Sequence, residues 1–133
     1  NTGPAGVLAD ASLQGCLNKI LLADDQLKAE TLTLLACPGA GVSSLAGIQA
    51  LENLEQLELS DNVVSDLRPL SALKSLRVLS IRNNGLRNVT TLEELPILLF
   101  VSLQGNDELP CRQLDKLQKK LGNTLTRPLT CRN

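Results

Sequence analysis

The chain has 133 residues, the size of a single domain, and a formal net charge of −1. It contains no histidine, tryptophan or tyrosine, and Phe100 is its one aromatic residue. Histidine-based nucleophile pairs and zinc sites are therefore excluded, and a nucleic-acid interface would lack both the basic charge and the stacking aromatics that it needs.

The first part of the chain predicts a leader followed by a helix. Residues 1–9 are expected to form a flexible leader, and residues 10–31 a helical segment. Asp10 is a good helix N-cap, because its carboxylate can accept hydrogen bonds from the first backbone N–H groups. After it, apolar side chains recur at helical spacing at Leu13, Leu17, Ile20 and Leu21. A short second helix or turn is expected over residues 28–32.

An internal repeat with a constant period covers residues 32–110. Four units begin at Leu32, Leu54, Leu76 and Leu98. Within a unit, apolar residues alternate with polar ones, as at Leu57 and Leu59, which predicts a short strand with one buried face. No unit can bury its own apolar edge, so we expect the units to stack.

An asparagine follows the strand in three of the units, at Asn62, Asn84 and Asn106, where the first unit has Ala40. We expect the asparagine side chain to turn the chain and to bond backbone groups of the neighbouring turn. In the return segments the apolar residues are three apart, as at Leu67 and Leu70. That spacing favours 3₁₀ or extended turns over full helices.

The last part of the chain predicts a second helix and a tail over residues 111–133. Leu114, Leu117 and Leu121 would line one face of a helix that begins near Arg112 and ends at Gly122. This segment carries a net charge of +5, whereas residues 1–66 carry −7. Lysine and arginine near the C-terminus of a helix are typical of a solvated terminal helix.

The repeat resembles the leucine-rich repeat in its 22-residue, internalin-like subclass, LxxLxxLxLxxNxIxxLxxLxx, over about residues 32–110. The resemblance implies an α/β fold. This would be a curved, right-handed solenoid with a short parallel sheet on its concave face, a helical N-cap at 10–31 and a helical C-cap at 111–133. The departures are Ala40 and Cys37 in the first unit and the break of the last unit at Pro110.

The four cysteines allow three pairings. Cys16 lies on the core face of the first helix and Cys37 takes an inward strand position, so the two should lie side by side. Cys111 begins the second helix and Cys131 lies in the tail that returns after it. We therefore predict disulfides Cys16–Cys37 and Cys111–Cys131, one at each cap, which favours an oxidising compartment. Four reduced, buried cysteines in a cytosolic protein are the alternative.

Side chains between the strand leucines are expected to face solvent on the concave side. They form four columns: Leu34, Gln56, Val78 and Phe100; Ala36, Glu58, Ser80 and Ser102; Pro38, Ser60, Arg82 and Gln104; and Gly39, Asp61, Asn83 and Gly105. Apolar residues in the first column, flanked by charged ones, indicate a protein-binding patch. The predicted partner-binding residues are Leu34, Gln56, Glu58, Asp61, Val78, Ser80, Arg82, Phe100, Ser102 and Gln104. Alternatively, Leu34 packs under the N-cap and Phe100 under the C-cap.

These features predict a non-enzymatic module that binds a protein partner through its concave face, as a monomer or weak dimer. We expect no cofactor, no metal, no nucleic acid and no membrane span. The resemblance implies a periplasmic, outer-membrane-anchored or secreted protein of the bacterial cell envelope, including a lipoprotein whose anchor precedes residue 1. A cytosolic regulatory scaffold of the phosphatase-binding leucine-rich-repeat type is the alternative, and a structural or enzymatic role comes third.

Overall fold

A computed structural model describes residues 8–131, so most of the predicted leader lies outside the described residues. Helix α1 covers Ala11–Ala23 and helix α2 covers Cys111–Leu121. The strands are β1 (Leu34–Ala36), β2 (Gln56–Glu58), β3 (Val78–Ser80), β4 (Phe100–Ser102) and β5 (Leu125–Thr126). The 3₁₀ turns are η2 (Ala29–Thr31), η3 (Ile48–Ala50), η4 (Arg68–Ala72), η5 (Thr90–Glu94), η6 (Gly122–Thr124) and η7 (Leu129–Cys131).

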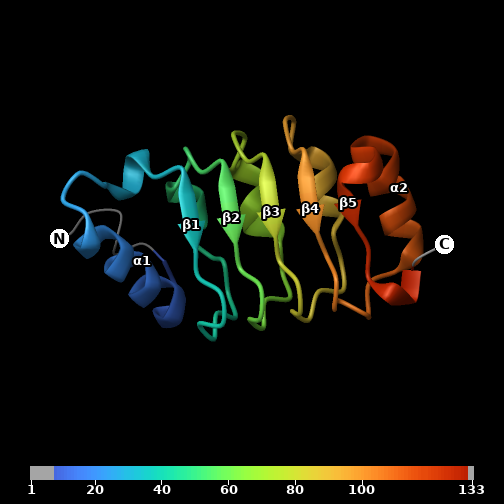
Figure 1. Ribbon diagram of the computed structural model, residues 1–133, viewed down its shortest axis with the longest axis horizontal. Helices are drawn as coiled ribbons and strands as arrows, with labels where there is room; N and C mark the ends of the chain where they lie inside the picture. The colour runs from blue at the N-terminus through green and yellow to red at the C-terminus, as the bar shows by residue number, and fades with distance from the viewer. Residues whose placement is uncertain (1–7, 132–133) are drawn as a thin grey trace.

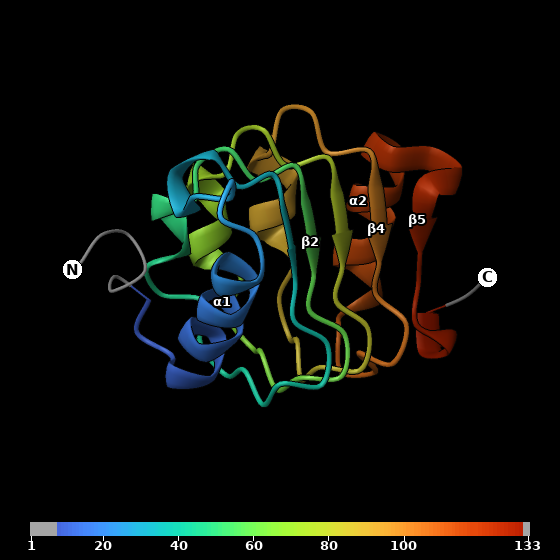
Figure 2. The same cartoon turned by 60° about the vertical axis from the view of Figure 1, so that its left-hand side comes forward.

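The five strands form one parallel sheet in the order β1-β2-β3-β4-β5. Figures 1 and 2 show the strands side by side, with turns η3, η4 and η5 behind them, α1 at one end and α2 at the other. The predicted parallel-sheet solenoid is therefore confirmed. Each return segment contains a short 3₁₀ turn rather than a full helix, as the spacing of its apolar residues predicts.

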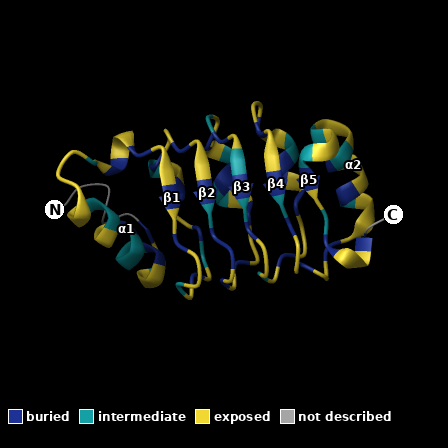
Figure 3. Ribbon diagram, in the orientation of Figure 1, coloured by how far each residue is buried: buried dark blue, intermediate teal, exposed yellow. Residues whose placement is uncertain are grey.

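The core is a stack of leucine-rich layers, because each unit contributes the same inward positions. The central strand residues Leu35, Leu57, Leu79 and Val101 are each at most 1% exposed. Their strand neighbours point outward, and the alternation of buried and exposed positions is visible along the strands in Figure 3. Burying a leucine stabilises the fold by about 1.5–3 kcal/mol relative to leaving it exposed, so the repeated layers supply most of the stability.

The asparagines bond the backbone of neighbouring turns as predicted. The Oδ1 atom of Asn62 accepts hydrogen bonds from the backbone N–H groups of Ala40 and Val42, and its Nδ2 donates to the carbonyl oxygens of Cys37 and Leu59. Asn106 makes the corresponding four bonds two units later. One unit later, Asn84 accepts from the N–H of Val64 and donates to the carbonyl oxygens of Leu59 and Ile81. These side chains therefore satisfy backbone groups that the turns leave without partners in the interior.

One disulfide lies at each end of the molecule. Cys16 of α1 is joined to Cys37, and Cys111 of α2 is joined to Cys131, the two pairings that the sequence predicted. Each bond connects a more exposed cysteine to a buried one, since Cys37 is 1% and Cys131 4% exposed. The first bond therefore joins α1 covalently to the first repeat, and the second joins α2 to the end of the C-terminal cap.

Strand β5 was not expected from the sequence, which predicted only a helix and a tail after residue 110. In the structure Leu125 pairs with Val101 and Thr126 with Ser102, and the N–H of Leu103 donates to the carbonyl oxygen of Thr126 over 2.9 Å. The repeat spacing would instead place the partner of Val101 at Asn123, but α2 replaces the usual return segment and shifts the pairing. The strand is thus outside the repeat frame, and periodicity does not reveal it.

Asp10 holds α1 against the first unit as well as capping it. Its Oδ1 accepts hydrogen bonds from the N–H groups of Ser12 and Leu13, and its Oδ2 accepts from the N–H and hydroxyl of Ser43 and the N–H of Ser44. Partial burial by itself would raise the pKa of Asp10, but the bonds from Ser43, Leu13 and Ser44 outweigh it and lower the pKa to about 2.

We expect Asp10→Asn to lower the free energy of unfolding by about 1–2 kcal/mol near pH 6, because an amide N–H₂ would face the donors of Ser43 and Ser44. The carboxylate stabilises the fold above the ordinary pKa of about 3.8, and this contribution is lost as pH falls through about 2. Urea denaturation at pH 6, 4, 3 and 2 should therefore show a shrinking difference from wild type. A difference that stays constant with pH would contradict the assignment, and the exposed Asp25→Asn is the control.

Candidate functional site

The predicted partner-binding residues all lie on strands β1 to β4 or just after them. In the first column the structure places Leu34, Gln56, Val78 and Phe100 directly opposite one another across the four strands. Leu34 is 49% and Phe100 52% exposed, while Val78 is half-buried. The alternative in which Leu34 and Phe100 complete the cores of the two caps is therefore wrong. We call the outward side of these strands, with the residues just after them, the sheet face.

Two further apolar residues extend the exposed surface at β4, and the sequence analysis did not single them out. Ile97 is 47% and Leu99 44% exposed, and we name Ile97, Leu99 and Phe100 the β4 patch. The N–H groups of Leu99 and Phe100 both donate to the carbonyl oxygen of Arg77, which fixes this segment on the sheet. Comparing equivalent positions of the repeat units would have revealed the β4 patch. The position of Leu99 is charged in the two preceding units, at Glu55 and Arg77.

The second and third columns are polar and partly engaged with the protein itself. Glu58 is half-buried and its Oε1 accepts a hydrogen bond from the N–H of Ser60, whose hydroxyl lies 3.1 Å from that of Ser80. Ser60 is only 2% exposed, so its expected solvent-facing position is wrong. The reason is that its hydroxyl also accepts from the N–H of Arg82 and links adjacent turns. Arg82, Gln104 and half-buried Ser102 remain accessible.

The fourth column forms the turns after the strands, where the backbone enters the left-handed region. Asp61 has φ 63° and Asn83 φ 54°, and Gly39 and Gly105 also have positive φ. Asn83 Nδ2 donates to Asp61 Oδ1 over 2.9 Å, so Asp61 is exposed but oriented by its neighbour. Position 105 requires glycine, because a Cβ atom there would collide with the side chain of Asn83.

Charge is divided across the sheet face. Glu55, Glu58 and Asp61 lie on or beside β2, whereas Arg77 and Arg82 flank β3. Within residues 8–131, none of these five side chains takes part in an ion pair. The face is therefore acidic toward β1 and basic toward β4, and the first column, which is apolar except at Gln56, runs through both parts.

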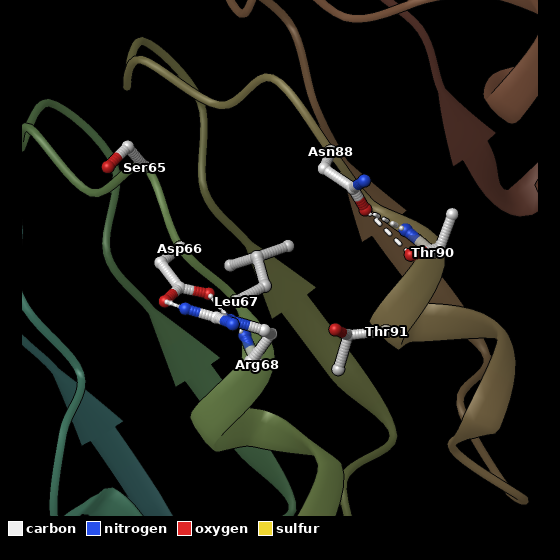
Figure 4. Close-up of a pocket in the computed structure, with 7 residues that line it drawn as sticks. All are labelled: Ser65, Asp66, Leu67, Arg68, Asn88, Thr90 and Thr91. Atoms are coloured by element: carbon white, nitrogen blue, oxygen red, sulfur yellow. Dashed lines mark hydrogen bonds and ion pairs between the residues drawn. The ribbon is translucent and has the colours of Figure 1, made fainter.

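A polar pocket of about 420 Å³ lies between η4 and η5, away from the sheet face (Figure 4). Four of the residues that line it bond to one another in two pairs. Asp66 makes an ion pair of 2.9 Å with Arg68, and the hydrogen bond from that guanidinium holds the pKa of Asp66 below its usual value. Asn88 Oδ1 accepts from the N–H and the hydroxyl of Thr90. These contacts begin the two 3₁₀ turns, so the pocket's polar groups have a structural role.

Among residues 8–131 there is no cluster of three histidine, cysteine, aspartate or glutamate side chains that could hold a metal ion. The same residues contain no helix that is long and apolar enough to cross a membrane.

Comparisons with known proteins agree with the geometry. A family model described as leucine-rich repeats in two copies matches residues 42–96. Among solved structures, an internalin (inlF) from Listeria monocytogenes superposes with a TM-score of 0.79 at 26% identity, covering 97% of this chain and 39% of that one. Internalin C2 (inlC2) from the same organism superposes with a TM-score of 0.69 at 26% identity, covering 81% and 50%. A search of curated proteins gave no match.

The chain thus spans half or less of the length of the two internalin structures that it resembles. Solenoids of stacked repeats present extended surfaces that commonly bind proteins, and they are typically not catalytic. The regularly repeated units, the parallel sheet and the two superpositions together show that this chain is a leucine-rich repeat protein, structurally close to the internalins of Listeria.

Proposed function

We propose that the chain is a non-enzymatic recognition module outside the cytoplasm and that it binds a protein partner through the sheet face. The observation that carries the proposal is the first column, which crosses regularly spaced strands and exposes an apolar residue at each end, with Phe100 52% and Leu34 49% exposed. Phe100 is exposed beside Ile97 and Leu99, and aromatic side chains in exposed apolar patches commonly anchor interfaces. The charged groups around the column would orient the partner.

The extracytoplasmic location is supported by the two disulfides, because such bonds persist in oxidising compartments and are rare in the cytosol. The same bonds weigh against a cytosolic regulatory scaffold of the phosphatase-binding type. The similarity to internalins supports a bacterial surface, secreted or lipid-anchored protein.

We expect the double variant Val78→Asp, Phe100→Asp to weaken partner binding by about 100-fold or more, since each substitution removes apolar contact and buries a charge at the interface. Wild-type and variant protein would be used to capture partners from the envelope and secreted fractions of the source organism. A captured protein would then be purified and its dissociation constant measured by calorimetry with both forms.

The matched control is Leu22→Asp, Val63→Asp, because these side chains are 82% and 62% exposed and lie outside the sheet face. It adds the same charge and should leave affinity within about twofold. Circular dichroism and urea midpoints verify folding of both variants. A partner held equally by wild type and the sheet-face variant would show that binding occurs elsewhere, and an equal loss in the control would show that only charge matters.

A further inference from the structure

An apolar groove of about 340 Å³ lies at the acidic end of the sheet face, between α1 and β1. One wall is made by Ile20 of α1 and Leu27 of the loop that follows it. The other residues that line it come from β1 and the segment before it: Thr31, Leu32, Thr33, Leu34 and Ala36. We name this the N-cap groove. Its volume is at the lower end of the range of ligand pockets and suits a large side chain rather than a whole cofactor.

The walls of the N-cap groove are fixed by packing and by a disulfide of the N-terminal cap. Ile20 and Leu27 pack against the core and remain half-exposed, and Leu34 is 49% exposed on the same sheet face. The disulfide joins Cys16, one helical turn before Ile20, to Cys37, the residue after Ala36. Both walls are therefore fixed covalently, so an incoming group would not have to order them.

Carboxylates lie next to the lining residues of this groove in the chain, and few cations accompany them. Asp24 and Asp25 lie between Ile20 and Leu27, Glu30 directly precedes Thr31, and Lys28 is the one cation in residues 21–30. On the other side, the backbone N–H of Glu55 donates to the carbonyl oxygen of Thr33, which places Glu55 beside the groove. In the part of the chain that the structure describes, none of these four carboxylates makes an ion pair. An apolar groove with an acidic rim is complementary to an apolar side chain with basic neighbours.

We propose that the N-cap groove binds a large apolar or aromatic side chain carried by a basic segment of the protein partner. This inference rests on the proposed function and extends it, because it gives the chemistry of one part of the partner. Leu34 and the β4 patch are three strands apart, or about 14 Å at roughly 4.8 Å per strand. A partner segment that crosses the strands would therefore place one anchor in the groove and a second against Phe100.

A second copy of this chain is the competing occupant, because residues 111–133 are basic and Leu129 is 73% exposed. The structure disfavours it. The neighbouring Arg127 is committed to Asp115 over 2.9 Å, and its side chain is only 10% exposed. Arg127, the basic residue nearest before Leu129 in the chain, is therefore already paired and does not offer its charge to the groove.

The test uses the peptide Lys-Lys-Gly-Trp-Gly-Lys-Lys, acetylated and amidated at its ends. Since the protein contains no tryptophan or tyrosine, fluorescence of the peptide reports binding without background. We expect a blue shift of its emission and binding at least about 10-fold tighter than that of the matching peptide with glutamate in place of lysine. A competing peptide with alanine in place of tryptophan should not displace it. Amide resonances of residues 27–36 should shift in the NMR spectrum of the labelled protein.

Variants locate the site. Thr33→Phe fills the groove and should weaken peptide binding at least about 10-fold, whereas Thr126→Phe, an exposed threonine at the far end of the same sheet, should leave it within twofold. Should Thr33→Phe fail to fold, the exposed pair Asp25→Asn, Glu30→Gln should weaken binding of the lysine peptide without altering the fold. Equal binding of the lysine and glutamate peptides, or binding unaffected by these variants, would overturn the proposal.

Two other results would also overturn it. One is no detectable binding of the lysine peptide. The other is concentration-dependent self-association in sedimentation that Thr33→Phe abolishes, which would make a second copy the occupant. Phe100→Asp separates this proposal from the proposed function, since it should spare peptide binding and abolish partner capture. Peptide failure with Phe100-dependent capture intact overturns the groove alone. If the peptide binds but capture does not depend on Phe100, only the proposed function, partner binding through the sheet face, is overturned.

Discussion

Asn62→Ala should lower the free energy of unfolding by about 3–5 kcal/mol, more than any surface change in the chain. Asn62 is 5% exposed, and its Oδ1 accepts from the N–H groups of Ala40 and Val42 at 3.0 and 2.8 Å. Its Nδ2 donates to the carbonyl oxygens of Cys37 and Leu59, both at 2.9 Å. Leu59 would keep a second bond, from Asn84 Nδ2, but alanine would remove these partners of Ala40, Val42 and Cys37. Each buried backbone group left without a partner costs about 1–3 kcal/mol.

Urea denaturation of wild type and Asn62→Ala measures the effect, and two further variants define its cause. Asn88→Ala, at an exposed asparagine that bonds only to Thr90, should cost less than about 1 kcal/mol. Asn62→Asp retains the acceptor but loses the donors, and it also adds a buried charge. Its loss of stability should therefore be at least intermediate between those of Asn88→Ala and Asn62→Ala. If Asn62→Ala lost no more stability than Asn88→Ala, the buried asparagines would not hold the turns together.

The sheet and its register could be predicted because the same residue types recur at the same positions of each repeat unit. The units are equal in length, so Leu34, Gln56, Val78 and Phe100 must become neighbours once the units stack, and the structure places them so. The role of the buried asparagines could be predicted in the same way, because they take the same position in successive units. Local chemistry identified Asp10 as a helix cap, since an N-cap involves only its nearest neighbours.

Features that depend on how distant segments dock could not be read from periodicity. The second role of Asp10 involves Ser43 and Ser44, which belong to the first repeat and lie far from α1 in the sequence. The N-cap groove exists only because α1 lies against β1 in one particular way. Ser60 is buried where its hydroxyl contacts Ser80 and the N–H of Arg82 in the next unit, although its position in the repeat suggested an outward side chain. In each case tertiary contacts decide the outcome and the local pattern does not.

The second large effect concerns the C-terminal disulfide. We expect the variant Cys111→Ser, Cys131→Ala to lose about 3 kcal/mol, because each disulfide closes a loop of about 20 residues. Alanine at the buried position avoids leaving an unpaired hydroxyl in the core. The matched variant Cys16→Ser, Cys37→Ala opens a loop of nearly the same length, so its loss of stability should be similar.

The two variants should differ in where they loosen the structure, which amide hydrogen exchange detects. Strand β5 is very short and pairs with β4 alone, so without the Cys111–Cys131 bond we expect it to fray. The N–H of Leu103, which donates to Thr126, should then exchange faster, and the N–H of Cys37, which donates to Glu58, should not. The Cys16–Cys37 variant should open α1 and the N-cap groove and spare Leu103.

Equal exchange at both ends in both variants would show that the bonds stabilise the fold only globally. Local fraying of β5 would also affect the binding surface. Fraying of β5 makes β4 the edge strand, and the β4 patch lies on that strand and the residues just before it. Loss of the C-terminal disulfide should therefore weaken partner binding through Phe100 while the groove peptide still binds. Loss of the N-terminal disulfide should do the opposite, because Cys16 and Cys37 fix the walls of the groove.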